Sequence, residues 1–227
     1  MKRNNKWVIY TSSYDRGLEH LLKMWADVKK EVKDSELHIF YGWDLFVKFY
    51  QNNPSSMAWK KKMDELMKQD GVIDHGRVKQ DEIKEWYQKC GIWAYPTHFG
   101  EISCISAMKA QAWGSIPVVI NYAALKTTVK YGKKIDGDIY EKETISKFKR
   151  NLINSLKDEV WQNAIRKKMM EWAKKEYGWD KVAKQWTDEF KKDELKEAMD
   201  VILKKDPNLE KYMPLKLQEK YGLPYSY

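Results

Sequence analysis

Short apolar segments alternate with longer amphipathic segments along the N-terminal half of the chain, and this alternation restricts the fold more than any other feature. The apolar segments are rich in β-branched and aromatic residues, which predicts buried strands. They cover residues 7–11, 37–41, 72–76, 92–95 and 116–120. Between them, apolar residues recur at helical spacing, as from Leu18 to Val32. The sequence therefore predicts an α/β fold in which a doubly wound parallel sheet is covered by helices on both faces.

The expected helices cover residues 18–32, 44–67, 81–89, 105–113, 144–156, 160–175 and 179–190. Asn52-Asn53-Pro54 divides the second of these into two, with Ser55 or Ser56 as the expected N-cap of the later helix. Gly114 is expected to end the helix that precedes the fifth strand. Beyond residue 190 the chain is charged and then interrupted by prolines. We therefore expect a Rossmann-like domain at 1–190 and a helical or irregular C-terminal appendage at 191–227.

Composition limits the classes of partner. The chain has 227 residues and a formal net charge of +9, which suits nucleic acid, an anionic membrane surface or a phosphate-bearing small molecule. Its lysines alternate with acidic residues along the helices, as on solvated helix faces, and no RNA- or DNA-binding motif accompanies them. We therefore expect no nucleic-acid partner.

The two cysteines, Cys90 and Cys104, form neither a disulfide framework nor a zinc-binding spacing. The N-terminal apolar run is too short for a signal peptide, and no segment is long enough to span a membrane. These features predict a cytoplasmic protein that is peripheral to a membrane at most.

Two loops follow strands and precede helices, where parallel sheets bind ligands. The first, at 11–17, offers hydroxyl groups, the Arg16 guanidinium and Gly17. The second, at 96–104, contains Gly100 and Glu101. A carboxylate before a helix N-terminus can accept hydrogen bonds from sugar hydroxyls while the following backbone N–H groups hold a phosphate. The simpler alternative is that Glu101 only caps the helix.

Four segments carry a resemblance to a known family. They are YTSSYDRGL at 10–18, HIFYGW at 38–43, GRV at 76–78 and YPTHFGEISCISAMKAQAWGSIPVV at 95–119. In this order they closely resemble the C-terminal domain of family-four GT-B glycosyltransferases, over residues 6–190. The resemblance implies the nucleotide-sugar-binding, Rossmann-like half of a retaining glycosyltransferase.

The resemblance also implies roles for individual residues. The Glu101 carboxylate would contact hydroxyls of the donor sugar, and Arg16 would neutralise the diphosphate, so these two are the expected catalytic residues. The expected substrate- and nucleotide-binding residues are Ser12, Ser13, Gly17, Arg77, Val78, His98, Gly100, Ile102, Ser103, Cys104, Ile105 and Lys109. The reaction implied is transfer of a hexose from a nucleoside diphosphate sugar with retention, without a metal or other cofactor. Asp136-Gly137-Asp138 resembles a metal-binding DxD motif, but it is also typical of a surface turn.

Departures from the family pattern leave alternatives open. Lys109 stands where a second glutamate usually binds the ribose, and Thr11-Ser12-Ser13 replaces a stretch that often contains an arginine. The N-terminal domain that carries the acceptor site in GT-B enzymes is not represented in the motifs. We therefore expect a separate N-terminal-half subunit or a second copy of the chain as partner, and a glycan, lipid-linked or protein acceptor. The alternative function is a non-catalytic nucleotide-sugar-binding or regulatory module.

Overall fold

The computed structural model describes residues 2–190 and Lys204. Its centre is a six-stranded parallel sheet with the order β3-β2-β1-β4-β5-β6. The strands are β1 (Asn4–Tyr10), β2 (Glu36–Ile39), β3 (Val72–Asp74), β4 (Cys90–Tyr95), β5 (Ile116–Ile120) and β6 (Lys133–Ile135). The doubly wound parallel sheet predicted from the sequence is confirmed.

The sixth strand was not predicted. It has three residues, of which two are lysines and only Ile135 is buried. Such a strand carries no apolar run, because it lies at the edge of the sheet. Its pairing with β5 sets its position instead, with Ile120 opposite Ile135.

The centre of the sheet is made of β1 and β4. Val8 of β1 pairs with Leu37 on one side and with Ile92 on the other, and all three side chains are buried. All six residues of β4 are buried, as expected for a strand covered on both faces. Each apolar side chain removed from water contributes about 1.5–3 kcal/mol before the entropy of ordering is counted. These strands therefore give the site a rigid base.

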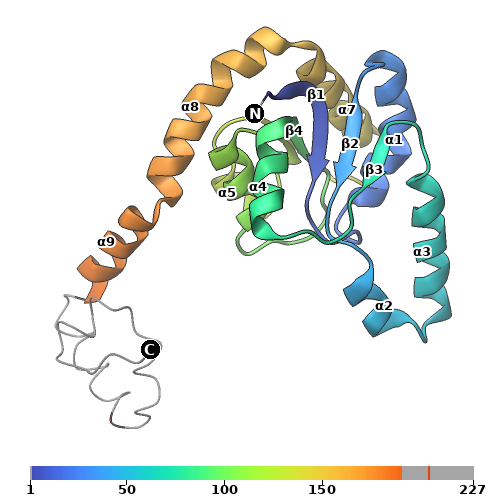
Figure 1. Cartoon of the computed structure of the whole chain (residues 1–227), viewed down its shortest axis with the longest axis horizontal. Helices are drawn as coiled ribbons and strands as arrows, with labels where there is room; N and C mark the ends of the chain where they lie inside the picture. The colour runs from blue at the N-terminus through green and yellow to red at the C-terminus, as the bar shows by residue number, and fades with distance from the viewer. Residues whose placement is uncertain (1, 191–203, 205–227) are drawn as a thin grey trace. The chain divides into compact units, whose positions relative to one another are not determined.

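Helices cover both faces of the sheet (Figure 1). On one face lie α4 (Gln80–Lys89) and α5 (Ile105–Trp113), and on the other lie α1 (Leu18–Glu31) and α7 (Lys142–Lys157). The buried residues of α1 recur at intervals of three and four, which is why it packs along one side. Gly114 ends α5 in the left-handed conformation, as predicted.

The segment after β2 forms α2 (Asp44–Tyr50) and α3 (Pro54–Leu66), divided at the predicted place. The predicted N-cap was wrong by two or three residues. The Asn53 side chain accepts a hydrogen bond from the Ser56 backbone N–H at 3.0 Å, and Pro54 occupies the first turn. Asparagine before a first-turn proline is a favourable start, because the proline needs no hydrogen-bond partner for its nitrogen.

The chain divides into two units between Lys174 and Lys175. In the first, α6 (Leu125–Thr128) follows β5, and the part of α8 (Glu159–Tyr177) up to Lys174 is anchored near the amino ends of the strands. There Gln162 donates to the Asn5 carbonyl at 2.9 Å, and the buried Arg166 donates to the Gly114 carbonyl at 2.9 Å. The second unit contains α9 (Trp179–Phe190). The predicted appendage at 191–227 lies outside the described residues except for Lys204, so the boundary at 190 stays a prediction.

Among the described residues, no helix is both long and apolar enough to cross a membrane.

Candidate functional site

The order of the strands reverses between β1 and β4, and the loops after these two strands meet at the carboxyl edge of the sheet. Open α/β sheets bind their ligands at such a reversal, because the two loops diverge there and leave a crevice. Gly17 makes the approach of the loops possible. Its φ is +114°, and a Cβ at this position would lie 2.3 Å from the Pro96 carbonyl oxygen. Only glycine fits between the loops in this conformation.

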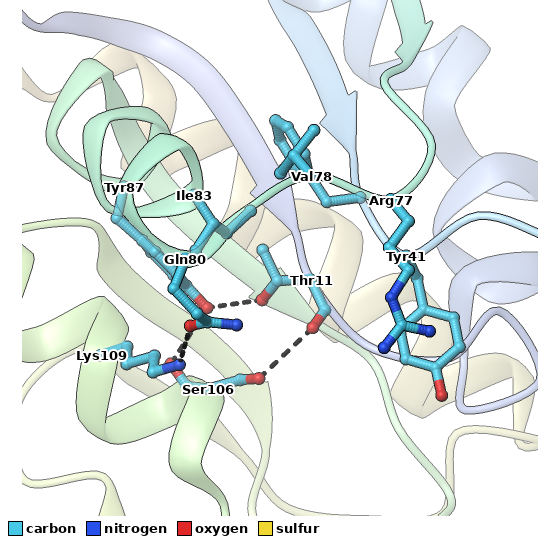
Figure 2. A pocket seen from close by; sticks show the side chains of 10 residues that line it. Thr11, Tyr41, Arg77, Val78, Gln80, Ile83, Tyr87, Ser106 and Lys109 are labelled. Atoms are coloured by element: carbon cyan, nitrogen blue, oxygen red, sulfur yellow. Dashed lines mark hydrogen bonds between the residues drawn. The ribbon is translucent and has the colours of Figure 1, made fainter.

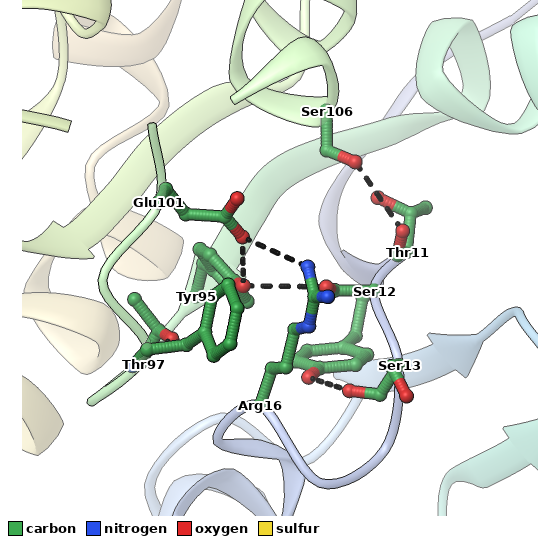
Figure 3. Close-up of polar contacts among 10 residues, drawn as sticks. Thr11, Ser12, Ser13, Arg16, Tyr95, Thr97, Glu101 and Ser106 are labelled. Carbon is green, nitrogen blue, oxygen red and sulfur yellow. Dashed lines mark hydrogen bonds and ion pairs between the residues drawn. The ribbon is translucent and has the colours of Figure 1, made fainter. Parts of the chain in front are cut away.

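Arg16 and Glu101 face each other across this crevice (Figure 3). The Arg16 Nη1 lies 3.5 Å from the Glu101 Oε1, although the residues are 85 positions apart in the sequence. The guanidinium also lies 3.9 Å from the centre of the Phe99 ring, which supports one of its faces. The Arg16 side chain is 36% exposed and that of Glu101 is 11% exposed. The fold thus brings the two expected catalytic residues together at a site that solvent can enter.

Tyr95 fixes the Glu101 carboxylate. Its hydroxyl donates a hydrogen bond to Oε1 at 2.8 Å, and the Ser12 hydroxyl lies 3.2 Å from the same Tyr95 oxygen (Figure 3). Burial raises the pKa of Tyr95, so the phenol keeps its proton and remains a donor. Glu101 does not cap α5, because the N-cap residue is Cys104 and no side chain caps that helix. The capping interpretation of Glu101 is therefore wrong.

The N-terminus of α5 points into the same region. Ile102, Ser103 and Ile105 are exposed in and just before the first turn of the helix, and Ile102 is 98% exposed. Helix N-termini carry free backbone N–H groups and a partial positive charge, which favours anions. Cys104 is buried there, and burial raises the pKa of its thiol to about 11 despite nearby backbone N–H groups. The thiol is therefore protonated at neutral pH.

A cavity of about 220 Å³ opens beside this crevice (Figure 2). Arg77 and Tyr41 lie on one side of it, and Lys109 and Ser106 lie on the other. Its lining is completed by Thr11, Phe40, Val78, Gln80, Ile83 and Tyr87. The Lys109 Nζ donates to the Gln80 Oε1 at 2.5 Å. Three of the sequence-predicted residues, Arg77, Val78 and Lys109, are thus brought to one cavity.

Hydrogen bonds hold the floor of this cavity. The Thr11 and Tyr87 hydroxyls lie 2.5 Å apart, and the Ser106 hydroxyl donates to the Thr11 carbonyl at 3.3 Å (Figure 2). Trp93 of β4 donates from Nε1 to the Thr11 hydroxyl at 3.2 Å. These contacts join β1, α4, β4 and α5 around the cavity.

Three other predicted residues, His98, Ser13 and Gly100, do not line the cavity of Figure 2. His98 is exposed and contacts the His20 and Tyr140 rings, outside the cavity of Figure 2. The Ser13 carbonyl accepts a hydrogen bond from the Tyr10 hydroxyl at 2.8 Å. Gly100 is exposed, and a Cβ there would meet no protein atom within 4 Å.

Two minor features have structural roles. Asp136 and Asp138 belong to a turn, in which Asp136 accepts from the Asn121 side chain and Asp138 accepts from the Tyr140 backbone N–H. No group of three or more metal-binding side chains occurs within the described part of the chain. Trp43 packs edge-on against Tyr14 and does not line the cavity of Figure 2.

Sequence reasoning missed several residues at the site. These are Gln80, Tyr87, Tyr95 and Ser106. Tyr95 had a usable signal, because it is a polar-tipped residue at the carboxyl end of a buried strand. The others had none, since tertiary packing alone selects them from many similar side chains.

A family model for glycosyl transferases group 1 matches residues 2–178. The chain belongs to this family. No curated protein sequence matches the chain.

Solved glycosyltransferase structures share the fold at low sequence identity. A GtfA/B complex matches with a TM-score of 0.67 and 14% identity, over 84% of this chain and 36% of the other. Anabaena Alr3699/HepE, solved with UDP-glucose, matches with a TM-score of 0.63 and 14% identity, over 83% and 49%. The pneumococcal O-GlcNAc transferase GtfA, solved with UDP and GlcNAc, matches with a TM-score of 0.59 and 14% identity, over 84% and 36%. The chain therefore spans less than half the length of each of these structures.

Proposed function

We propose that this chain is the donor-binding half of a retaining, family-four GT-B hexosyltransferase that uses a nucleoside diphosphate sugar. The observation that carries the proposal is the meeting of Arg16 and Glu101 at the strand-order reversal, beside the N-terminus of α5 and a separate cavity. A cation, a carboxylate and free helix N–H groups in one crevice match the diphosphate and the sugar hydroxyls of such a donor.

Arg16 and the N-terminus of α5 would stabilise the leaving diphosphate. When the sugar leaves, negative charge grows on the diphosphate, and stabilising that charge lowers the barrier. Arg16 has five N–H donors and directs one of them to Glu101, so the others remain available for phosphate oxygens. The α5 N-terminus adds its partial positive charge. We propose no metal or other cofactor, because these groups supply the positive charge that a metal would otherwise provide.

The cavity of Figure 2 suits the nucleoside. Its volume is smaller than the range of about 300–1,000 Å³ that is common for drug-sized ligands, so it would hold only part of the donor. We propose that the base lies near Gly76-Arg77-Val78 and that Lys109 meets the ribose or a phosphate. Uridine diphosphate is the first candidate, since two of the structural neighbours were solved with UDP or UDP-glucose.

The acceptor and partner are also part of the proposal. We propose transfer in the cytoplasm, with peripheral attachment to a membrane at most, to a glycan, lipid-linked or protein acceptor in glycan biosynthesis. A separate N-terminal-half subunit or a second copy of the chain would supply the opposite wall of the cleft. The structural neighbour solved as a GtfA/B complex supports a partnered arrangement.

Calorimetric titration with UDP-glucose and UDP tests the donor site. Loss of one partner from a charge-assisted hydrogen bond costs about 1.5–3 kcal/mol, so Arg16→Ala should weaken binding of both ligands roughly tenfold to a hundredfold. Arg150→Ala is the matched control, because Arg150 is an exposed arginine on α7 and is not among the residues placed at the donor site. Equal affinities in the two variants would remove Arg16 from the donor site.

A turnover measurement distinguishes the proposed enzyme from the alternative, a non-catalytic binding module. Incubation of the purified chain with UDP-glucose, followed by measurement of released UDP, reports hydrolysis or transfer. Slow release that Arg16→Ala abolishes supports the enzyme. Tight binding with no release, even with the partner present, supports the module.

A further inference from the structure

Among the described residues, the cavity of Figure 2 is lined by two cations and by no carboxylate. Arg77 lies on one side of the cavity and Lys109 lies on the other. The remaining lining residues are apolar or carry a hydroxyl or an amide, and they are Thr11, Phe40, Tyr41, Val78, Gln80, Ile83, Tyr87 and Ser106. The lining therefore carries two positive charges that no described lining residue balances.

Both cations keep N–H groups for a ligand. The Arg77 side chain makes no hydrogen bond or ion pair with another described residue. The Lys109 Nζ donates to the Gln80 Oε1 at 2.5 Å and lies 5.8 Å from the centre of the Trp113 ring, and both of these groups are neutral. An ammonium has three N–H donors and a guanidinium has five. Most of these donors are therefore available to a ligand in the cavity.

The charged residues that flank the cavity do not line it. Lys79, Asp81 and Glu82 are adjacent to Gln80 in the sequence, and all three are exposed. The two acidic residues lie in the first turn of α4, where they offset the partial positive charge of that helix end. The Asp74 carboxylate accepts two hydrogen bonds and also lies outside the lining. Water screens such flanking charges, whereas the two lining cations contact a ligand directly.

A neutral nucleoside does not match these two cations. A base and a ribose carry no charge, so a nucleoside in the cavity would cover Arg77 and Lys109 without neutralising them. Covering an unpaired charge is unfavourable, and a charge-assisted hydrogen bond to a phosphate compensates for the lost water. The diphosphate of the proposed donor lies elsewhere, at Arg16. The cavity therefore fits a ligand that carries a further anionic group.

The cavity and the crevice at Arg16 share one wall. The Ser106 hydroxyl donates to the Thr11 carbonyl at 3.3 Å, and this pair lies at the cavity in Figure 2 and beside Arg16 and Glu101 in Figure 3. A single nucleotide can therefore contact Arg16 with one phosphate and the cations of the cavity with another.

We propose that the cavity binds a phosphate on the ribose of a nucleotide. The ligand class is a nucleoside that is phosphorylated at the 5′ position and also at the 2′ or 3′ position. Lys109 and Arg77 hold the ribose phosphate, and Arg16 holds the 5′ phosphates. The inference rests on the proposed function, which places a nucleoside in this cavity, and it adds a charged group that this nucleoside carries.

Calorimetric titration of the full chain with a series of nucleotides tests the proposal. The probes are the 5′-monophosphate, the 2′,5′-bisphosphate and the 3′,5′-bisphosphate of uridine and of adenosine, at one salt concentration. At least one bisphosphate should bind about tenfold or more tightly than its monophosphate, because it gains charge-assisted hydrogen bonds. The isomer that binds more tightly identifies the position on the ribose.

Substitution of the cations assigns this gain in affinity to the cavity. Lys109→Gln and Arg77→Gln should each remove most of the gain and should keep the affinity for the 5′-monophosphate within about threefold, which also shows that the site is folded. Lys84→Gln is the matched control, because Lys84 is an exposed lysine on α4 that does not line the cavity. It removes the same charge from the chain and should leave the gain unchanged.

Four results would overturn the proposal. These are no binding of any probe, equal affinities of each bisphosphate and its monophosphate, an equal effect of Lys84→Gln and Lys109→Gln, and equal weakening of monophosphate and bisphosphate by Lys109→Gln. The last result would place Lys109 at the 5′ phosphate. Titration with UDP-glucose distinguishes this inference from the proposed function. Binding of UDP-glucose without a gain for any bisphosphate would refute the inference alone, and a gain that depends on Lys109 without binding of UDP-glucose would refute the donor site alone.

Discussion

At the scale of single residues, the contact between Arg16 and Glu101 contributes little to stability. The atoms are 3.5 Å apart and partly exposed, and exposed ion pairs contribute about 0–1 kcal/mol. The contact with Phe99 and the hydrogen bond from Tyr95 nevertheless hold both charged groups in place. Fixed charges of this kind suit a ligand whose charge changes during the reaction.

Glu101→Gln distinguishes a contact with the sugar of the donor from a contact with its nucleotide. In the proposed donor site the Glu101 carboxylate accepts hydrogen bonds from sugar hydroxyls and repels phosphate, so replacing it with a neutral amide should weaken UDP-glucose binding by about 1.5–3 kcal/mol. Binding of free UDP should stay equal or become tighter. Calorimetry with both ligands checks this, with Asp64→Asn on α3 as a control for loss of an acidic group. Equal weakening of both ligands would show that Glu101 acts on the nucleotide or on folding.

A second residue-scale feature is the pair His38 and His75. Their ring nitrogens lie 3.0 Å apart, and the rings pack among Trp7, Phe40 and Trp86. Burial lowers the pKa of His38 to about 4, with help from the positive charges of His75 and Lys89, and burial also lowers the pKa of His75. Both imidazoles are therefore neutral in the folded protein at neutral pH.

This pair predicts loss of stability in mild acid. The unfolded chain binds a proton at His38 below its ordinary pKa of 6.5, and the folded chain does so only near pH 4. Stability is therefore complete above pH 6.5 and falls between 6.5 and 4, by about 2 kcal/mol from pH 7.5 to pH 5 for His38 alone. Urea unfolding at the two pH values checks this, and His38→Gln should reduce the difference. An equal difference in that variant would assign the effect to other groups.

The low pKa of Glu19 does not disturb this measurement. Burial raises the pKa, but hydrogen bonds from Lys23, Lys62 and Trp59 outweigh it and lower the value to about 2. A carboxylate with a lowered pKa loses its contribution only as the pH falls below its ordinary value of 4.5. That range lies below the measured interval.

At the scale of elements, the spacing of apolar residues along the sequence predicted most of the fold. Five strands and the main helices were found because each carries an apolar run or stripe that must be buried. The misses have local causes. β6 has one buried residue and depends on its neighbour, and the N-cap of α3 is Asn53 because it precedes the first-turn Pro54. Neither choice is visible from periodicity.

The site was predictable to the extent that it lies on loops at the ends of strands. Arg16 and Glu101 meet because β1 and β4 are neighbours, which the doubly wound order requires. The polar floor was not predictable, because Tyr87 and Ser106 lie on different helices whose rotation about their axes decides what they face. Sequence spacing does not specify that rotation between elements.

Substitution of Gly17 tests how closely the loops after β1 and β4 pack against each other. Gly17→Ala places a Cβ against the Pro96 carbonyl at a positive φ, which should cost at least about 1 kcal/mol and should move Arg16 away from Glu101. Urea unfolding and UDP-glucose titration should both show a loss. Gly100→Ala is the matched control for the unfolding measurement alone, because its Cβ meets no protein atom within 4 Å, and its stability should change by less than about 0.5 kcal/mol. Similar stabilities in the two variants would contradict the proposed packing of the loops.

At the scale of the whole molecule, the carboxyl edge of the sheet is apolar where it surrounds the donor site. Phe99, Ile102 and Ile105 are all exposed there. Apolar side chains gathered at the rim of a polar crevice are typical of an interaction surface, because water covers them poorly. Under the proposed function, a second wall of the cleft would close over these side chains.

We therefore predict that this chain binds its donor but transfers sugar slowly on its own. Holding an acceptor against the donor can contribute roughly 7–11 kcal/mol to lowering a barrier, and a single wall provides only part of that positioning. A transfer assay over a wide range of protein concentrations, with candidate acceptors and with a truncation ending at Phe190, measures this. Activity that rises more steeply than the protein concentration indicates a second copy as the opposite wall, and activity restored by another polypeptide indicates a separate subunit. Fast turnover by a chain shown to be monomeric would refute the prediction, because it would mean that one wall is enough for both substrates.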